Sequence, residues 1–401
     1  MRKITQKSNT VTPDKTVPFG NIRDKTTLIG GTPVNTDVYE DMHQFYQKLF
    51  EAANVKPNEL KENSVNGFQM MAALGQMISR VINPMVFDKF FSSTNVIGDF
   101  TGSWLSIAYG SGIYVRAGNN GTAGIISISP DGINHELVLT AAVGDNFVAV
   151  DVSDTGVIIG IAQNGGFVST VYTSLDYGQN WTTFLVPGSF PAFDIAFASG
   201  SEWGIIGLDG TGGFFMHTTD NGANYITTSL AAGTVPNKVI YGGGQFCITL
   251  AGTGTQQIAF TVDGSSFTLP VHTATINQMV SATYAVINED YYGYGSTTAD
   301  KVFIIVSNNV SGVPVALHGD ETALTTVTLP NENFRAVEYG NGKIVMLSIS
   351  ATNDANITQS FDFFRNFQAV SNSLTLDVYD VAYAGGKFVM CGTSETTPLM
   401  Q

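Results

Sequence analysis

The residues with most potential for catalysis are acidic side chains that recur at related places in the C-terminal three quarters of the chain. Asp151, Asp194, Glu338 and Asp380 each fall on a segment that we predict to be the first strand of a repeat. A glycoside hydrolase needs two carboxyl groups across a cleft, one of them acting as an acid. Asp194, Glu338 and Asp380 are therefore the catalytic candidates, and the alternative is that they are solvated acids lining a channel.

Clustered arginines would indicate a different chemistry, the binding of a substrate carboxylate. Guanidinium groups bind carboxylates through two parallel hydrogen bonds, which fix geometry as well as charge. Beyond residue 92 the chain has only Arg116, Arg335 and Arg365, and Arg365 falls inside a predicted turn. That leaves Arg116 and Arg335 as the arginines that could bind a carboxylate together.

The other residue types exclude several classes of function. The five histidines lack metal-ligand spacing, and the glycines lie in turns rather than in a phosphate-binding loop, so we expect no metal and no cofactor. A net charge of −15 argues against nucleic-acid binding. No apolar run is long enough for membrane insertion, and the N-terminus lacks the apolar core of a signal peptide. The aromatic run Tyr291, Tyr292 and Tyr294 is a possible ligand contact, because aromatic faces pack on sugar rings; the alternative is an ordinary strand.

A repeat organises the chain beyond residue 92. A segment ending in Tyr or a small residue, a Gly-rich turn and an aliphatic strand recur seven times, most clearly at 109–115, 241–247, 339–345 and 383–389. The spacing of about 44 residues is typical of one four-stranded blade of a β-propeller. We therefore predict a mainly all-β domain over residues 92–401, a seven-bladed β-propeller with six blades as the alternative. The seventh copy is short, and Thr94–Phe100 is expected to complete it.

One type of turn follows the repeats in a fixed phase. Its best copy is Ser174-Leu-Asp-Tyr-Gly-Gln-Asn-Trp181. A short polar side chain can hydrogen-bond the backbone two or three residues on, and the glycine supplies a positive φ. The predicted turn residues in the five copies are Ser129, Asp131, Gly132, Ser174, Asp176, Gly178, Trp181, Thr218, Asp220, Gly222, Tyr225, Thr261, Asp263, Gly264, Ser360, Asp362 and Phe367.

These turns resemble the Asp-box, or bacterial neuraminidase repeat, family of β-propellers. The resemblance implies that the boxes are rim hairpins away from the ligand face, so we interpret them as structural. The family includes sialidases, which bind a substrate carboxylate with three arginines. The chain departs from that pattern, and the resemblance therefore indicates a fold and not an activity.

Two further segments precede the predicted propeller. Residues 1–35 contain scattered Pro and Gly without periodicity, which predicts an extended arm. The arm has six basic and two acidic residues, a net charge of +4, so the rest of the chain carries −19. Residues 36–91 contain two heptad-spaced apolar patterns, which predict a helical hairpin ending near residue 84. We expect residues 36–84 to form a homo-oligomer, with a trimer favoured, and packing against the propeller is the alternative.

The order of arm, helical pair and propeller resembles that of phage virion fibre or tail-appendage proteins. It implies a non-enzymatic virion structural protein that assembles in the host cytoplasm. Residues 1–35 would bind other virion proteins, and the propeller would recognise a host-surface glycan or protein. The alternatives are a propeller-type glycoside hydrolase or lyase acting on surface polysaccharide, and a cellular scaffold.

Overall fold

The structure is a computed structural model of the 401-residue chain. It describes residues 10–11, 21–22 and 102–393, with internal gaps at 133, 255–256, 271–275, 288–299, 309–312, 350–354, 361–362, 365 and 371–376. The chain divides into one unit of residues 87–287 and 300–401 and another of residues 1–86 and 288–299.

The described part of the second unit lies within the predicted arm. Strands β1 (Thr10–Val11) and β2 (Asn21–Ile22) pair there in antiparallel fashion. The predicted helical segment 36–91 and the predicted closing strand Thr94–Phe100 lie outside the described residues.

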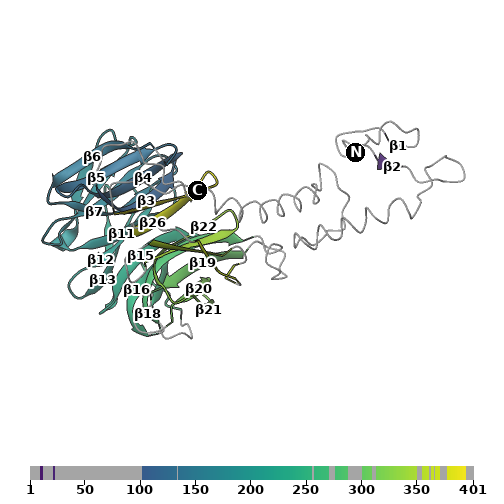
Figure 1. The fold of residues 1–401 in the computed structure, drawn as a ribbon. Coiled ribbons are helices and arrows are strands. Elements are labelled where there is room, and N and C mark those ends of the chain that lie inside the picture. Colours follow the sequence, from purple (N-terminus) through teal and green to yellow (C-terminus); the bar gives the residue numbers. More distant parts are fainter. Residues whose placement is uncertain are drawn as a thin grey trace, which may run out of the picture. The chain divides into compact units, whose positions relative to one another are not determined.

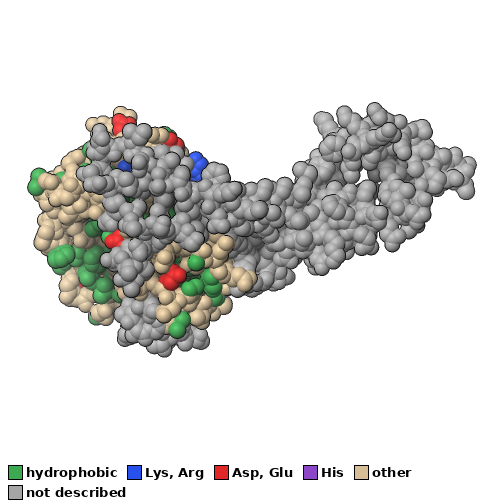
Figure 2. All heavy atoms as spheres, viewed as in Figure 1, with side chains coloured by type: hydrophobic (Ala, Val, Ile, Leu, Met, Phe, Trp, Pro, Cys, Tyr) green, Lys and Arg blue, Asp and Glu red, His purple; other side chains and the backbone are tan. Residues whose placement is uncertain are grey.

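The larger unit is built from successive antiparallel strands, so the predicted all-β class is confirmed. Its described residues contain no α-helix, only the short 3-10 helix η2 (Pro187–Ser189), and none of its described helical segments could span a membrane. The sheets lie around a common centre (Figure 1). The side chains on the face drawn in Figure 2 include few charged residues outside the regions in grey.

Each group of strands starts with an inner strand, which pairs with a second strand. In most groups a third strand pairs with the second, and an outer strand pairs with the third. The inner strands are β3 (Ser103–Gly110), β7 (Asn146–Val152), β11 (Ala192–Phe197), β15 (Val235–Gly242), β18 (Ile276–Ile287), β22 (Asn333–Gly340) and β26 (Asp377–Ala384). The second strands are β4 (Ile113–Asn119), β8 (Ile158–Gln163), β12 (Trp203–Leu208), β16 (Gln245–Gly254), β19 (Asp300–Ser307), β23 (Lys343–Ile349) and β27 (Lys387–Thr393). The third strands are β5 (Ala123–Ser129), β9 (Ser169–Ser174), β13 (Gly212–Thr218), β17 (Ile258–Thr261), β20 (Val315–Gly319) and β24 (Ala355–Ser360). The outer strands are β6 (Glu136–Val143), β10 (Thr182–Leu185), β14 (Ile226–Ala232), β21 (Leu324–Thr328) and β25 (Gln368–Val370).

The hydrophobic core lies between the faces of neighbouring groups. Each inner strand contacts the next one in sequence, and β26 contacts β3, so that the inner strands form a closed ring. One core cluster joins Trp104 and Ile107 of β3 to Val389 and Cys391 of β27. The Tyr114 hydroxyl also donates a hydrogen bond to the carbonyl of Ala384 at 2.9 Å. The last group therefore packs directly on the first.

A β-bulge occurs at the same place in every inner strand. The pairing with the second strand shifts by one residue there, as between Trp104 and Ser106 in β3 or between Val378 and Asp380 in β26. The other five inner strands have the same shift. A bulge redirects the side chains that follow it. Residues at and after the bulges line the centre of the ring.

The turn after β9 contains the predicted residues Ser174 to Trp181. The Ser174 hydroxyl donates to Asp176 Oδ1 at 2.8 Å and accepts from the Gly178 N–H at 2.8 Å. The Asp176 carboxylate accepts from both the backbone N–H and the side-chain amide of Asn180, at 2.8 and 2.7 Å. The Trp181 indole donates to the Gly178 carbonyl at 2.9 Å. The asparagine was absent from the sequence-based account of this turn.

The other copies of the turn follow the same plan. Asn224 donates twice to Asp220, and Asn134 donates twice to Asp131. These hydrogen bonds lower the pKa of Asp220 to about 2 and also lower the pKa of Asp176. At Ser360 the hydroxyl accepts from the Phe364 N–H at 2.8 Å, while Asp362 lies outside the described residues. All of these contacts are internal to the turns.

Candidate functional site

Two cavities lie along the axis of the ring of inner strands. The large cavity, of about 360 Å³, is lined mainly by residues near the ends of the inner strands, where the chain turns toward the second strand. The small cavity, of about 150 Å³, is lined by residues nearer the strand starts. Lys238, Ser281 and Asp380 line both cavities, so they lie between the two.

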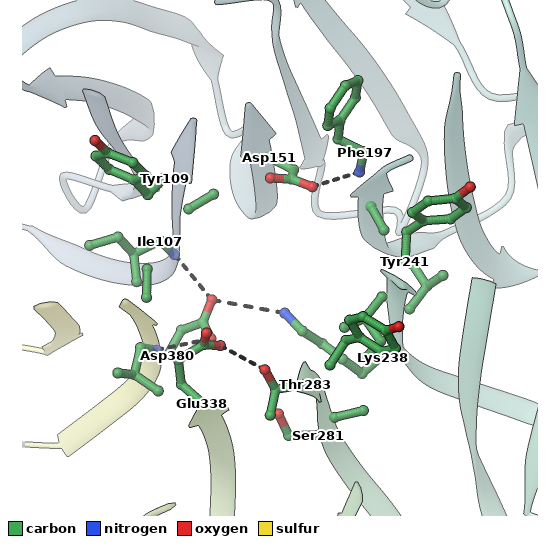
Figure 3. Close-up of a pocket in the computed structure, with 18 of the residues that line it drawn as sticks. Ile107, Tyr109, Asp151, Phe197, Lys238, Tyr241, Ser281, Thr283, Glu338 and Asp380 are labelled. Atoms are coloured by element: carbon green, nitrogen blue, oxygen red, sulfur yellow. Dashed lines mark hydrogen bonds and ion pairs between the residues drawn. The ribbon is translucent and has the colours of Figure 1, made fainter. Parts of the chain in front are cut away.

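Lys238 of β15 is the cation at this boundary. Its ammonium lies 3.4 Å from Asp194 Oδ1 on the neighbouring strand β11. It also lies 3.9 Å from Asp380 Oδ2 on β26, across the ring (Figure 3). A quarter of its side-chain surface is exposed. Burial alone would lower the pKa of Lys238, but the Asp194, Asp380 and Asp151 carboxylates outweigh burial and raise this pKa. Two of the three catalytic candidates, Asp194 and Asp380, thus contact the same lysine.

The acids also join adjacent inner strands. Asp380 Oδ2 accepts from the Ile107 N–H of β3 at 3.1 Å, and Asp194 Oδ2 accepts from the Val239 N–H of β15 at 2.8 Å. Asp151 Oδ2 likewise accepts from the Phe197 N–H of β11 at 2.6 Å. These N–H groups lie on the innermost strand of each sheet, on the side that faces the axis, where no further strand pairs with them. The carboxylates therefore accept hydrogen bonds from buried donors and connect neighbouring groups of strands.

Burial dominates the ionisation of these acids. It raises the pKa of Asp151 and of Asp194 to about 6, although the neighbouring N–H groups and Lys238 oppose the change. One ammonium is shared by several carboxylates, so it compensates each of them only in part.

Glu338 of β22 accepts hydrogen bonds from a side chain of the neighbouring strand β18 and from the N–H of the next residue, Tyr339. Glu338 Oε2 accepts from the Thr283 hydroxyl at 3.2 Å, and the side chain faces the large cavity beside Asp380 (Figure 3). Burial, and secondly the negative charge of Asp380, raise the pKa of Glu338 to about 8. At neutral pH this group is therefore mostly protonated and can donate a hydrogen bond.

Aromatic side chains surround the large cavity at the strand ends. Five inner strands place an aromatic residue at the same position, three residues beyond the residue that follows the bulge. These residues are Tyr109, Phe197, Tyr241, Tyr284 and Tyr383. Each lies against an aromatic ring of its own second strand at centroid distances between 4.7 and 5.1 Å. Figure 3 shows Tyr109 and Tyr241 on different sides of the opening. The cavity thus combines aromatic walls with charged residues at its base.

The recurrent Tyr-Gly pair of the sequence has a packing explanation. A Cβ at Gly340 would lie 2.1 Å from the ring of Tyr383 in the next inner strand. A Cβ at Gly242 would lie 2.1 Å from the ring of Tyr284. Glycine therefore makes room for the tyrosine of the following group. Sequence reasoning used these tyrosines only to mark the repeat and missed both their place around the cavity and the role of Lys238.

The remaining predicted residues do not join this site. Arg116 is buried within the first group, where its Nε donates to Ser127 Oγ at 2.8 Å and its guanidinium lies 3.9 Å from the Trp104 ring centroid. Burial lowers the pKa of Arg116 to about 10. Arg335 lines the small cavity instead. Arg365, Tyr291, Tyr292 and Tyr294 lie outside the described residues, and the described residues contain no metal-binding group of acids, cysteines and histidines.

No protein-family model matches this chain, and no curated protein matches its sequence significantly. Solved structures do match its fold. Virginiamycin B lyase from Staphylococcus aureus aligns over 77% of this chain and 97% of its own, with 11% identity and a TM-score of 0.58. The Cps50 (Swd1) beta-propeller domain from Myceliophteria thermophila aligns over 77% and 98%, with 8% identity and a TM-score of 0.56. YCF48, solved with a bound D1 peptide, aligns over 75% and 94%, with 12% identity and a TM-score of 0.54. Such low identities establish shared architecture and nothing finer. The larger unit of this chain has a β-propeller fold.

Proposed function

We propose that the chain is a non-enzymatic phage virion structural protein, a tail or fibre appendage whose propeller recognises the host surface. The propeller would have seven blades, one for each inner strand. Residues 1–35 would anchor the protein to the particle, because a net charge of +4 suits the acidic surface of another virion protein. Residues 36–84 would join three copies.

The large cavity is the observation that carries the recognition part of the proposal. Its aromatic walls offer flat apolar faces, on which the C–H faces of a sugar ring pack. Carboxyl groups at its base can accept hydrogen bonds from sugar hydroxyls, and protonated Glu338 can donate one. We therefore propose that a host-surface glycan binds at this end of the ring.

The partners of the acids favour binding over catalysis. Asp194 and Asp380 hold adjacent strands through backbone N–H groups and share Lys238. A catalytic carboxylate must exchange a proton or attack a sugar carbon, and these two are occupied with holding the ring closed.

The second candidate function is a propeller-type glycoside hydrolase or lyase, and Glu338 is the observation that favours it. A carboxyl group with a pKa of about 8 beside the Asp380 carboxylate has the protonation state of a general acid. Incubation of the full chain with host surface polysaccharide distinguishes the two functions. Cleavage of the polysaccharide by the wild type that is lost in Glu338→Gln, Asp380→Asn or Asp194→Asn would establish the enzyme. Intact polysaccharide bound by the wild type would support recognition.

Aromatic substitutions test where the glycan binds. Tyr241→Ala and Tyr383→Ala remove walls of the cavity, and we expect each to weaken binding to host cells or purified surface glycan by roughly tenfold. Phe167→Ala is the matched control, because Phe167 is 68% exposed and lies outside the cavity lining. Binding that falls with Phe167→Ala and not with the tyrosine variants would place recognition elsewhere.

Two measurements test the virion assignment. Antibodies against the propeller should label purified particles at the tail or its fibres in electron microscopy. Light scattering of the full-length chain should give a mass of three copies. Unlabelled particles, or a monomeric chain with folded helices, would contradict the corresponding part of the proposal.

A further inference from the structure

Carboxyl groups outnumber cations around the large cavity. Asp151, Glu338 and Asp380 line it, and Lys238 is the one basic residue among the described residues of its lining. If all were ionised, three carboxylates and one ammonium would leave a net charge of −2. Lys238 is also shared with Asp194 of the small cavity, 3.4 Å from its ammonium. The large cavity therefore favours a cation over an anion.

Glu338 is the acid that responds to this excess of negative charge. The charged groups that face it from neighbouring strands are Asp380 of β26, which disfavours its ionisation, and Lys238 of β15, which favours it less strongly. Strand β18 contributes the neutral Thr283 hydroxyl (Figure 3). No ion pair joins Glu338 to a lysine, arginine or histidine in the part of the chain that the structure describes. Glu338 therefore keeps its proton, and a cation beside it would take the place of that proton.

The aromatic residues at the strand ends attract a cation independently of the acids. Tyr109, Phe197, Tyr241, Tyr284 and Tyr383 line the same cavity, and each is partly exposed. The electrons of aromatic rings attract positive charge, more strongly where water is excluded. The cavity volume of about 360 Å³ is within the range of small-molecule sites. Rings and carboxyl groups thus favour the same charge in one cavity of suitable size.

We propose that the large cavity binds a glycan with an unacetylated amino sugar, whose ammonium group lies beside Glu338 and Asp380 and displaces the proton of Glu338. A primary ammonium has three N–H donors, so it can hydrogen-bond both carboxylates, which a quaternary ammonium cannot. This inference rests on the proposed glycan recognition and specifies the class of glycan. A neutral sugar leaves the proton on Glu338, and an acidic sugar is repelled by Asp380.

Two trisaccharides that differ at nitrogen provide the probes. The glucosamine trimer carries ammonium groups at pH 6, and the N-acetylglucosamine trimer is neutral. Each is titrated into the full-length chain by calorimetry at constant ionic strength, in two buffers of different ionisation enthalpy, so that released protons are counted. We expect the glucosamine trimer to bind roughly tenfold more tightly, because it forms charged hydrogen bonds, and to release up to about one proton. The N-acetylglucosamine trimer should release none.

One substitution assigns the effect to Glu338. Glu338→Gln cannot give up a proton, so it should bind both trimers with similar affinity and lose most of the proton release. Glu136→Gln makes the same change at an exposed position on β6, outside both cavity linings, and should bind both trimers like the wild type. If Glu338→Gln does not fold, the comparison of the two trimers on the wild type decides.

Three results overturn the inference. They are equal affinity of the wild type for the two trimers, no binding of the glucosamine trimer, and a preference for that trimer that survives Glu338→Gln. Glycan recognition itself is judged separately, by the loss of host-glycan binding in Tyr241→Ala and Tyr383→Ala. A chain that binds host glycan through these tyrosines without preferring the amine therefore refutes the inference and leaves the proposed recognition intact.

Discussion

The unusual ionisation of Glu338 predicts that Glu338→Gln stabilises the protein at alkaline pH. A carboxyl group with a pKa of about 8 in the folded chain and 4.5 as its ordinary value binds its proton more tightly when folded. Folding stability from this group is complete below pH 4.5 and is lost as pH rises through 8. Glutamine cannot ionise, so the variant keeps this stability at high pH. Its amide oxygen can still accept the hydrogen bond from the Thr283 hydroxyl.

The size of the effect follows from the same pKa change. The full difference corresponds to roughly 5 kcal/mol. Because the side chain faces a cavity that water can enter, we expect on the order of 3 kcal/mol. The variant and the wild type should therefore have similar free energies of unfolding at pH 5, and the variant should be more stable by about that amount at pH 9.

Chemical unfolding at pH 5, 7 and 9 measures this difference, at one protein concentration because the chain is proposed to oligomerise. Glu136→Gln is the matched control, since Glu136 is exposed on β6 and lies outside both cavity linings. A difference between Glu338→Gln and wild type that is the same at pH 5 and pH 9 would refute the reasoning. It would mean that Glu338 ionises as readily in the folded chain as in the unfolded chain.

Three further substitutions test other contacts by chemical unfolding. Lys238→Met leaves the Asp194 and Asp380 carboxylates without their shared cation, and we expect a loss of about 3 to 5 kcal/mol at pH 7. The loss should shrink toward pH 5 as Asp194, whose pKa burial raises to about 6, becomes protonated; a pH-independent loss would contradict this assignment. Gly340→Ala places a methyl group against the ring of Tyr383 and should cost about 1 to 3 kcal/mol; a loss well below about 1 kcal/mol would contradict the ring contact. Gly112→Ala meets open space and should cost about 1 kcal/mol, from positive-φ backbone strain alone. Ser174→Ala removes the acceptor of the Gly178 N–H and should cost about 1 to 3 kcal/mol with no effect on glycan binding; reduced binding by the folded variant would show that the turn contributes to recognition.

The repeat was predictable from the sequence because its signals are local. A glycine at a turn and aliphatic residues in the strand that follows act within one hairpin, so each copy carries the full pattern. The all-β class and the propeller fold follow from that pattern, and both are confirmed. The number of blades and the helical segment remain predictions.

The centre of the ring was harder to predict because its contacts join residues far apart in the chain. Lys238 contacts Asp380 across the ring, and no spacing in the sequence relates the two. The bulge in each inner strand also shifts the alternation of side chains, so the residue that faces the axis cannot be counted from the start of the strand. Alignment of the repeats on the tyrosine that precedes each Gly-rich turn would have placed Tyr109, Tyr241 and Tyr383 in one column. The sequence alone did not indicate that this column surrounds a cavity.

The way the ring is closed bears directly on what the protein can do. Hydrolysis of a glycosidic bond requires two carboxyl groups with separate tasks. Asp380 holds β26 to β3 and Asp194 holds β11 to β15, so a change in the charge of either weakens the contact between neighbouring groups. Glu338 accepts hydrogen bonds from the Thr283 hydroxyl and the Tyr339 N–H, and one carboxyl group cannot be both acid and base in the same step. The same hydrogen bonds that complete the ring therefore leave its large cavity with groups suited to holding a sugar in place.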